Sequence, residues 1–189
     1  MVLLLGGCSY FKGKGTYNEM VVKKEAVDAQ WGQVQNVYQR RADLIPNIVE
    51  TVKGYAEFEQ STLSGVAEAR AKVGQITVTK EVVENPELLQ RFNQAQGELG
   101  GAISRLLSVA ENYPDLKANQ NFQALITELE GTENRIATER KKFNDAAQGY
   151  NSYIKLFPNN IFAGLFNFDE VAYFQAQAGS EQAPQVNFN

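Results

Sequence analysis

The chain has 189 residues, a net charge of −4, and 43% hydrophobic and 21% charged side chains. This is enough for one domain with a buried core, and the mild negative charge gives no electrostatic reason to expect nucleic acid as a partner. The sequence has no histidine and one cysteine, which excludes histidine-based catalysis, an internal disulfide and most zinc chemistry. No nucleotide-binding, calcium-binding or serine-hydrolase motif is present, so we expect no cofactor and no catalytic residues.

The single cysteine lies near the start of the chain, in a context that resembles a bacterial lipobox. Cys8 follows the apolar stretch Val2–Leu5 and two glycines. A complete secretory signal has roughly 7–15 apolar residues after a basic start, so this short stretch suggests a truncated or mis-assigned start. We expect residues 1–15 to form a lipoprotein-like signal and tether, with cleavage before Cys8 and lipid attached to it. The alternative is an unprocessed end with a free thiol.

A long amphipathic helix is predicted from Tyr17, with Thr16 as its N-cap. Its apolar side chains recur at steps of three and four: Tyr17, Met20, Val27, Trp31, Val34, Tyr38 and Ile45. Pro46 lacks an N–H and disfavours helix at the residue before it. We therefore expect a tight turn at 43–46 and a second helix that continues to about Val73. One kinked, continuous helix is the alternative.

Two further helices are predicted after a loop over 73–80. Asn85 and Pro86 are typical of a helix start, and this helix should end at Tyr113–Pro114. The last helix should run from Asn119 to Phe157. The sequence therefore predicts an all-α protein, an antiparallel four-helix bundle of long helices over residues 16–157. Close packing against a neighbouring helix would explain the pair Gly100–Gly101, which is costly in a helix.

The C-terminal segment, residues 158–189, is rich in aromatic side chains as far as Phe174. We expect 158–174 to pack on the bundle in extended form, because a purely disordered tail would not carry so many aromatics. The polar remainder, 175–189, is expected to be mobile. The aromatic residues are Phe162, Phe166, Phe168, Tyr173 and Phe174.

Four charged residues lie on the predicted apolar stripes: Arg41, Glu59, Arg70 and Arg140. Because an isolated buried charge is costly, we expect ion pairs that fix the helix register, Arg41 with Asp43 and Glu59 with Arg140. A polar site inside the bundle is the alternative. Helical bundles can bind metal pairs through Glu and Glu-x-x-His motifs. Without histidine we expect no metal site, although a site built from carboxylates alone stays open.

Several segments together resemble the LemA family over roughly residues 17–174. The resemblance implies a membrane-associated helical bundle of bacteria and supplies no catalytic residues. Typical members start with a transmembrane helix, whereas this chain offers Cys8, and lipidation would place the bundle outside the cytoplasm. The segments are Tyr17–Val21, Trp31, Arg40–Tyr55, Ser104–Leu107, Glu111–Ala118, Glu133–Ala137, Asn144, Tyr150–Asn151 and Phe157–Pro158.

The leading functional prediction is a non-enzymatic envelope protein that presents a surface to a protein partner. It would be bound to the bacterial membrane through its N-terminal lipid and face the periplasm or the cell exterior. One alternative is a carboxylate-based enzyme or metal carrier. Another is a peripheral membrane-remodelling protein with an exposed apolar helix face.

Overall fold

The computed structural model describes residues 2–55, 59–76 and 79–175, with side chains from Lys14 on. Over these residues the chain is all-α, as the sequence predicts, and has no strand. The helices are α1 (Val2–Lys53), α2 (Gln60–Gly74), α3 (Glu81–Glu84), α4 (Pro86–Ala110), α5 (Pro114–Lys117), α6 (Gln120–Lys155) and α7 (Asn159–Phe166).

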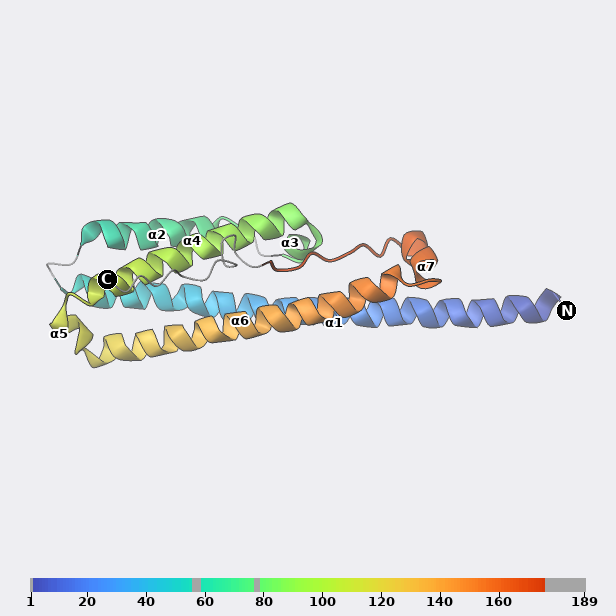
Figure 1. Ribbon diagram of the computed structural model, residues 1–189, viewed down its shortest axis with the longest axis horizontal. Coiled ribbons are helices and arrows are strands. Elements are labelled where there is room, and N and C mark those ends of the chain that lie inside the picture. Colours follow the sequence, from blue (N-terminus) through green and yellow to red (C-terminus); the bar gives the residue numbers. More distant parts are fainter. Residues whose placement is uncertain (1, 56–58, 77–78, 176–189) are drawn as a thin grey trace, which may run out of the picture.

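The long helices form two antiparallel pairs (Figure 1). α1 packs mainly against α6, and α2 packs mainly against α4. The α2–α4 pair covers only one half of α1. At the other end of the molecule, α7 and the segment after it lie beside the N-terminal half of α1 (Figure 1).

The first helix boundary differs from the prediction, because α1 continues through Pro46 as far as Lys53. The predicted turn at 43–46 is wrong, and the alternative prediction, a helix that continues through Pro46, is confirmed. Thr16 lies inside α1 and is not an N-cap. The apolar stripe crosses the proline without interruption, since Leu44, Ile45 and Ile48 are all buried. The chain turns instead after Gly54, and α2 begins at Gln60.

The later helix starts are confirmed. The Asn85 side chain accepts hydrogen bonds from the N–H groups of Glu87 and Leu88, and Pro86 is the first residue of α4. The Asn119 side chain caps α6 in the same way. These caps satisfy N–H groups that have no partner within the helix.

The core has two clusters along the molecule. In one of them Trp31 of α1 meets Phe92 of α4 and Phe143 of α6 edge-on, each with 5.8 Å between ring centroids. This cluster also contains Val171 and Phe174 from beyond α7. The second cluster joins the C-terminal half of α1 to α2, α4, α5 and the first half of α6.

The C-terminal segment is only partly as predicted. Residues 159–166 form α7, so the expectation of extended chain is wrong there, because Phe162 and Ala163 pack inward on one face of a short helix. Beyond Asn167 the chain is extended on the bundle, as expected, and buries Val171 and Phe174. The expected mobility of 175–189 concerns residues that lie, except Gln175, outside those described.

Candidate functional site

A groove of about 730 Å³ lies between α4 and α6, with α1 as its floor. Apolar side chains and polar groups share its surface. Its lining residues are Tyr38, Arg41, Asn93, Gln96, Gly97, Gly100, Gly101, Ile103, Ser104, Leu107, Leu129, Glu130, Glu133, Asn134, Ile136 and Arg140.

Glycines on α4 leave this groove open. A Cβ atom added at Gly100 or Gly101 would meet nothing within 4 Å. The close packing suggested by the sequence is therefore wrong at this pair. With Gly97, the two residues present only backbone to the groove, and they leave room there for another molecule.

Arg41 is the buried charge of the groove, with 4% of the residue exposed. Its Nη1 donates to Glu133 Oε1 at 2.9 Å, and its Nη2 donates to both the backbone and the side-chain oxygen of Gln96. The predicted pair with Asp43 is wrong, because that carboxylate accepts from Gln39 within α1. Arg41 is directed instead across the bundle, toward α4 and α6.

Two buried polar atoms on the groove have no hydrogen-bond partner among the described residues, Arg41 Nε and Asn93 Oδ1. Buried polar groups are nearly always hydrogen-bonded. Both atoms are buried beneath the surface of the groove, so they are not themselves open to a ligand.

The other charged residues of the apolar stripes do not pair as predicted. Arg140, at the rim of the groove, donates to the carbonyl of Gln175 at 3.1 Å and lies 4.6 Å from the ring centroid of Phe174. Glu59 accepts from the hydroxyl of Thr62 at the start of α2. The two side chains therefore do not pair: Glu59 lies just before α2, whereas Arg140 lies in the second half of α6, next to Phe174.

The tyrosine of the groove is poorly suited to acid–base chemistry near neutral pH. Burial raises the pKa of Tyr38 above its ordinary value, and the nearby Arg140 and Arg41 only partly oppose this. The guanidinium of Arg41 lies 5.2 Å from the centroid of its ring. Tyr38 therefore supplies a protonated hydroxyl and an aromatic face for cation contact.

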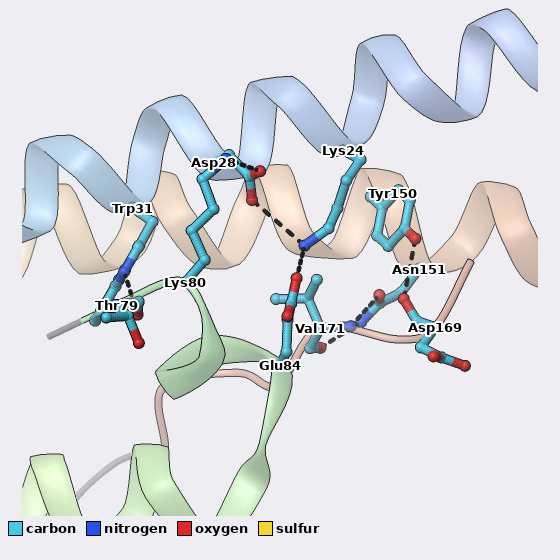
Figure 2. Close-up of polar contacts among 10 residues, drawn as sticks. All are labelled: Lys24, Asp28, Trp31, Thr79, Lys80, Glu84, Tyr150, Asn151, Asp169 and Val171. Carbon is cyan, nitrogen blue, oxygen red and sulfur yellow. Dashed lines mark hydrogen bonds and ion pairs between the residues drawn. The ribbon is translucent and has the colours of Figure 1, made fainter. Parts of the chain in front are cut away.

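A second polar cluster holds α3 and the extended segment after α7 against α1 and α6 (Figure 2). Lys24 of α1 bridges Asp28, at 3.3 Å, and Glu84 of α3, at 2.7 Å. Asp28 also pairs with Lys80 at 2.6 Å. The indole of Trp31 donates to the carbonyl of Thr79. These contacts fix the segment around α3 to the long helix pair.

On the α6 side of this cluster, Asn151 exchanges two hydrogen bonds with the backbone of Val171, at 2.8 and 2.9 Å (Figure 2). Asn144 makes the same pair of bonds with Phe174. The Tyr150 hydroxyl donates to the carbonyl of Asp169 at 3.0 Å. These residues, which contribute to the family resemblance, bind the chain's own C-terminal segment.

The sequence left a polar site inside the bundle open as an alternative but did not locate the groove. Its signals were Arg41 and Arg140 on the apolar stripes and the pair Gly100–Gly101. The expected lipid site, Cys8, lies outside the residues whose side chains are described. Among the described side chains, no cluster of three or more Asp or Glu residues could hold a metal ion. Nor does any helix there combine the length and hydropathy needed to cross a bilayer.

Comparison with known proteins finds relatives of similar sequence. The chain is 28% identical over 181 residues to the magnetosome protein MamQ 2 of Paramagnetospirillum magneticum, covering 87% of this chain and 66% of that one. It is 29% identical over 174 residues to the protein LemA of Metamycoplasma hominis, covering 92% and 75%. The chain thus spans just under two thirds of the length of MamQ 2. The family profile matches residues 30–188, and the chain belongs to the LemA family.

Proposed function

We propose that this protein is a membrane-anchored bacterial envelope protein without enzymatic activity, whose groove binds a segment of a partner protein. The observation that carries the proposal is the open groove over α1, where the glycines of α4 leave space between apolar and polar side chains.

The groove chemistry favours a peptide segment. A polypeptide offers an N–H and a C=O at every non-proline residue, and exposed polar side chains that line the groove, such as Glu130 and Asn134, can bond to these groups. Apolar side chains such as Ile103 and Leu129 line the same groove and can receive apolar side chains of the partner. The guanidinium groups of its arginines offer only hydrogen-bond donors, which suits the carbonyl groups of a peptide.

Site-specific crosslinking tests the groove. A photoreactive residue at Ser104, which lines the groove, should give a discrete protein adduct in native membranes. The matched control is Ser64, an exposed serine of α2 outside the groove. Gly100→Leu, which fills free space, should abolish the adduct without unfolding the chain. An adduct that persists in the Gly100→Leu chain, or that forms equally well from position 64, would exclude the groove as the binding site.

The anchor has its own test. Cys8 is the only thiol of the chain and follows Leu5, Gly6 and Gly7, so Cys8→Ser in the full-length native gene should release the protein from membranes. Unchanged membrane retention would contradict lipidation and favour a transmembrane start.

A further inference from the structure

Exposed hydrophobic side chains are unevenly distributed over the molecule. Among the described residues, every large hydrophobic side chain that is exposed comes from the first part of α1, from α7 with the residues before it, or from the segment after α7. None comes from α2, α3, α4 or α5. They are Tyr17, Val22, Leu156, Phe157, Ile161, Leu165, Phe166 and Tyr173.

The largest group surrounds α7. Leu156, Phe157, Ile161 and Leu165 are 61%, 81%, 59% and 68% exposed. Ile161 and Leu165 lie one turn apart on the same helix face, while Phe162 packs against the core. No charged side chain occurs anywhere in residues 156–168. We call Leu156, Phe157, Ile161, Leu165 and Phe166 the apolar end. Exposed apolar side chains concentrated in one short segment without charge are typical of a contact with a membrane or another protein.

The position of the apolar end distinguishes between a membrane and another protein as its contact. The ring of Phe166 meets Tyr17 of α1 edge-on, with 5.0 Å between centroids. α1 continues beyond this contact toward the N-terminus, at the same end of the molecule as α7 (Figure 1). Cys8 precedes Tyr17 by nine residues, which is about 14 Å of helix rise. The apolar stretch Val2–Leu5 comes before it.

We propose that the apolar end inserts into the interfacial layer of a lipid bilayer, as a second membrane contact beside the N-terminal anchor. The inference rests on the membrane anchoring proposed above. A bilayer is the occupant because the anchor already brings this end of the chain to the lipid surface. An interfacial helix lies with its apolar face about 5–10 Å deep in such a surface. A tilt of α1 against the membrane would bring α7 to this depth. The α2–α4 pair and the groove then face away from the membrane.

The test uses the full chain on vesicles of phosphatidylethanolamine and phosphatidylglycerol at about 3:1, coupled through Cys8 to a maleimide-bearing lipid. This synthetic tether holds all variants on the vesicle equally, so natural lipidation does not affect the result. Leu165→Trp supplies a reporter, with Ser64→Trp on α2 as the matched control. The native Trp31 is 1% exposed and gives a constant background.

Brominated acyl chains should quench the tryptophan introduced at position 165 several-fold more than the one at position 64, and its emission should shift to the blue. Ser104→Trp, in the groove, should behave like the control. Equal quenching at 165 and 64 would overturn the proposal. It would not affect the proposed anchor or the proposed groove, which separate experiments test. A blue shift at 165 that grows with protein concentration in the absence of vesicles would also overturn it, in favour of a second copy of the chain.

Discussion

Arg70 of α2 donates a hydrogen bond from Nε to the carbonyl oxygen of Ala42 in α1, at 3.3 Å. Ala42 is four residues before Pro46, so its carbonyl is the one that the missing proline N–H would have bonded within the helix. A side chain from the next helix therefore replaces the lost backbone donor. Arg70 is exposed, so its predicted place on the inward-facing stripe of α2 is wrong. Its contact with Ala42 helps α1 to pass through a proline.

The first prediction is that Pro46 and Arg70 are coupled. Pro46→Ala should raise the free energy of unfolding by about 1–2 kcal/mol, because alanine restores the N–H and removes the ring. Arg70→Met should cost about 1 kcal/mol in the natural chain and almost nothing in the Pro46→Ala chain. Urea unfolding of the natural chain, the two single variants and the double variant measures these differences in stability. An equal cost of Arg70→Met in both backgrounds would contradict the assignment.

The second prediction concerns Asn151, whose amide pairs with the buried backbone of Val171. Asn151→Ala leaves an N–H and a C=O without partners and should lower the free energy of unfolding by about 2–3 kcal/mol. It should also release the segment after α7, which increased hydrogen exchange at Val171 would detect. Asn160→Ala, at an exposed site of α7, is the control and should change stability by less than about 0.5 kcal/mol.

The third prediction is an asymmetry between Arg41 and Glu133. The side chain of Glu133 is 44% exposed, whereas that of Arg41 is 4% exposed. Glu133→Leu leaves a buried guanidinium without its carboxylate and should cost about 3 kcal/mol. Arg41→Met leaves a carboxylate that water can reach, and should cost less, about 1–2 kcal/mol.

Urea unfolding of both variants, with Glu130→Leu as a control at an exposed residue of the same groove, checks this order. The double variant should be less destabilised than the sum of the two single variants. A larger cost for Arg41→Met than for Glu133→Leu would show that the packing of the arginine stem outweighs its charge.

The fourth prediction is a pH dependence at Tyr150. Burial, followed by the charge of Asp169, raises its pKa to about 12. A raised pKa means that the folded chain holds this proton more tightly than the unfolded chain. The contribution of this proton to the stability of the folded chain is therefore complete below the ordinary tyrosine pKa of about 10, and it is lost as the pH rises from about 10 through 12.

Tyr150→Phe removes both this contribution and the hydrogen bond to Asp169, and should cost about 1 kcal/mol at pH 7. The difference in unfolding free energy between the natural chain and Tyr150→Phe should shrink between pH 10 and 12. Absorbance of tyrosinate should also show one late-titrating tyrosine that the variant lacks. A constant stability difference across this range would contradict the raised pKa.

The fifth prediction concerns the groove glycines. Gly100→Ala and Gly101→Ala place a methyl group in open space, and each should raise the free energy of unfolding by about 0.5–1 kcal/mol, because alanine favours the helix. Gly54→Ala, beyond the end of α1, should show no such gain. Thermal unfolding of the three variants measures the difference, and a loss of stability at position 100 or 101 would indicate that α4 packs more closely there.

The sequence by itself determined the all-α class, the apolar stripe of α1 and the starts of α4 and α6. These features depend on helix periodicity and on caps such as Asn85 and Asn119, which act within a few residues. It also indicated that Arg41 would be buried and that Phe174 would dock.

Only the tertiary structure decided the rest. α1 passes through Pro46 because its buried stripe continues and Arg70, a residue of another helix, supplies the missing donor. Arg41 pairs with Glu133 and not with Asp43, because the packing of the helices, and not distance along the sequence, determines which charges meet. The groove exists because α4 presents Gly97, Gly100 and Gly101 to α6 across α1, and no local rule specifies which helix faces a glycine. A short-range pattern fixes what one helix does, but contacts between helices depend on atoms that are far apart in the chain.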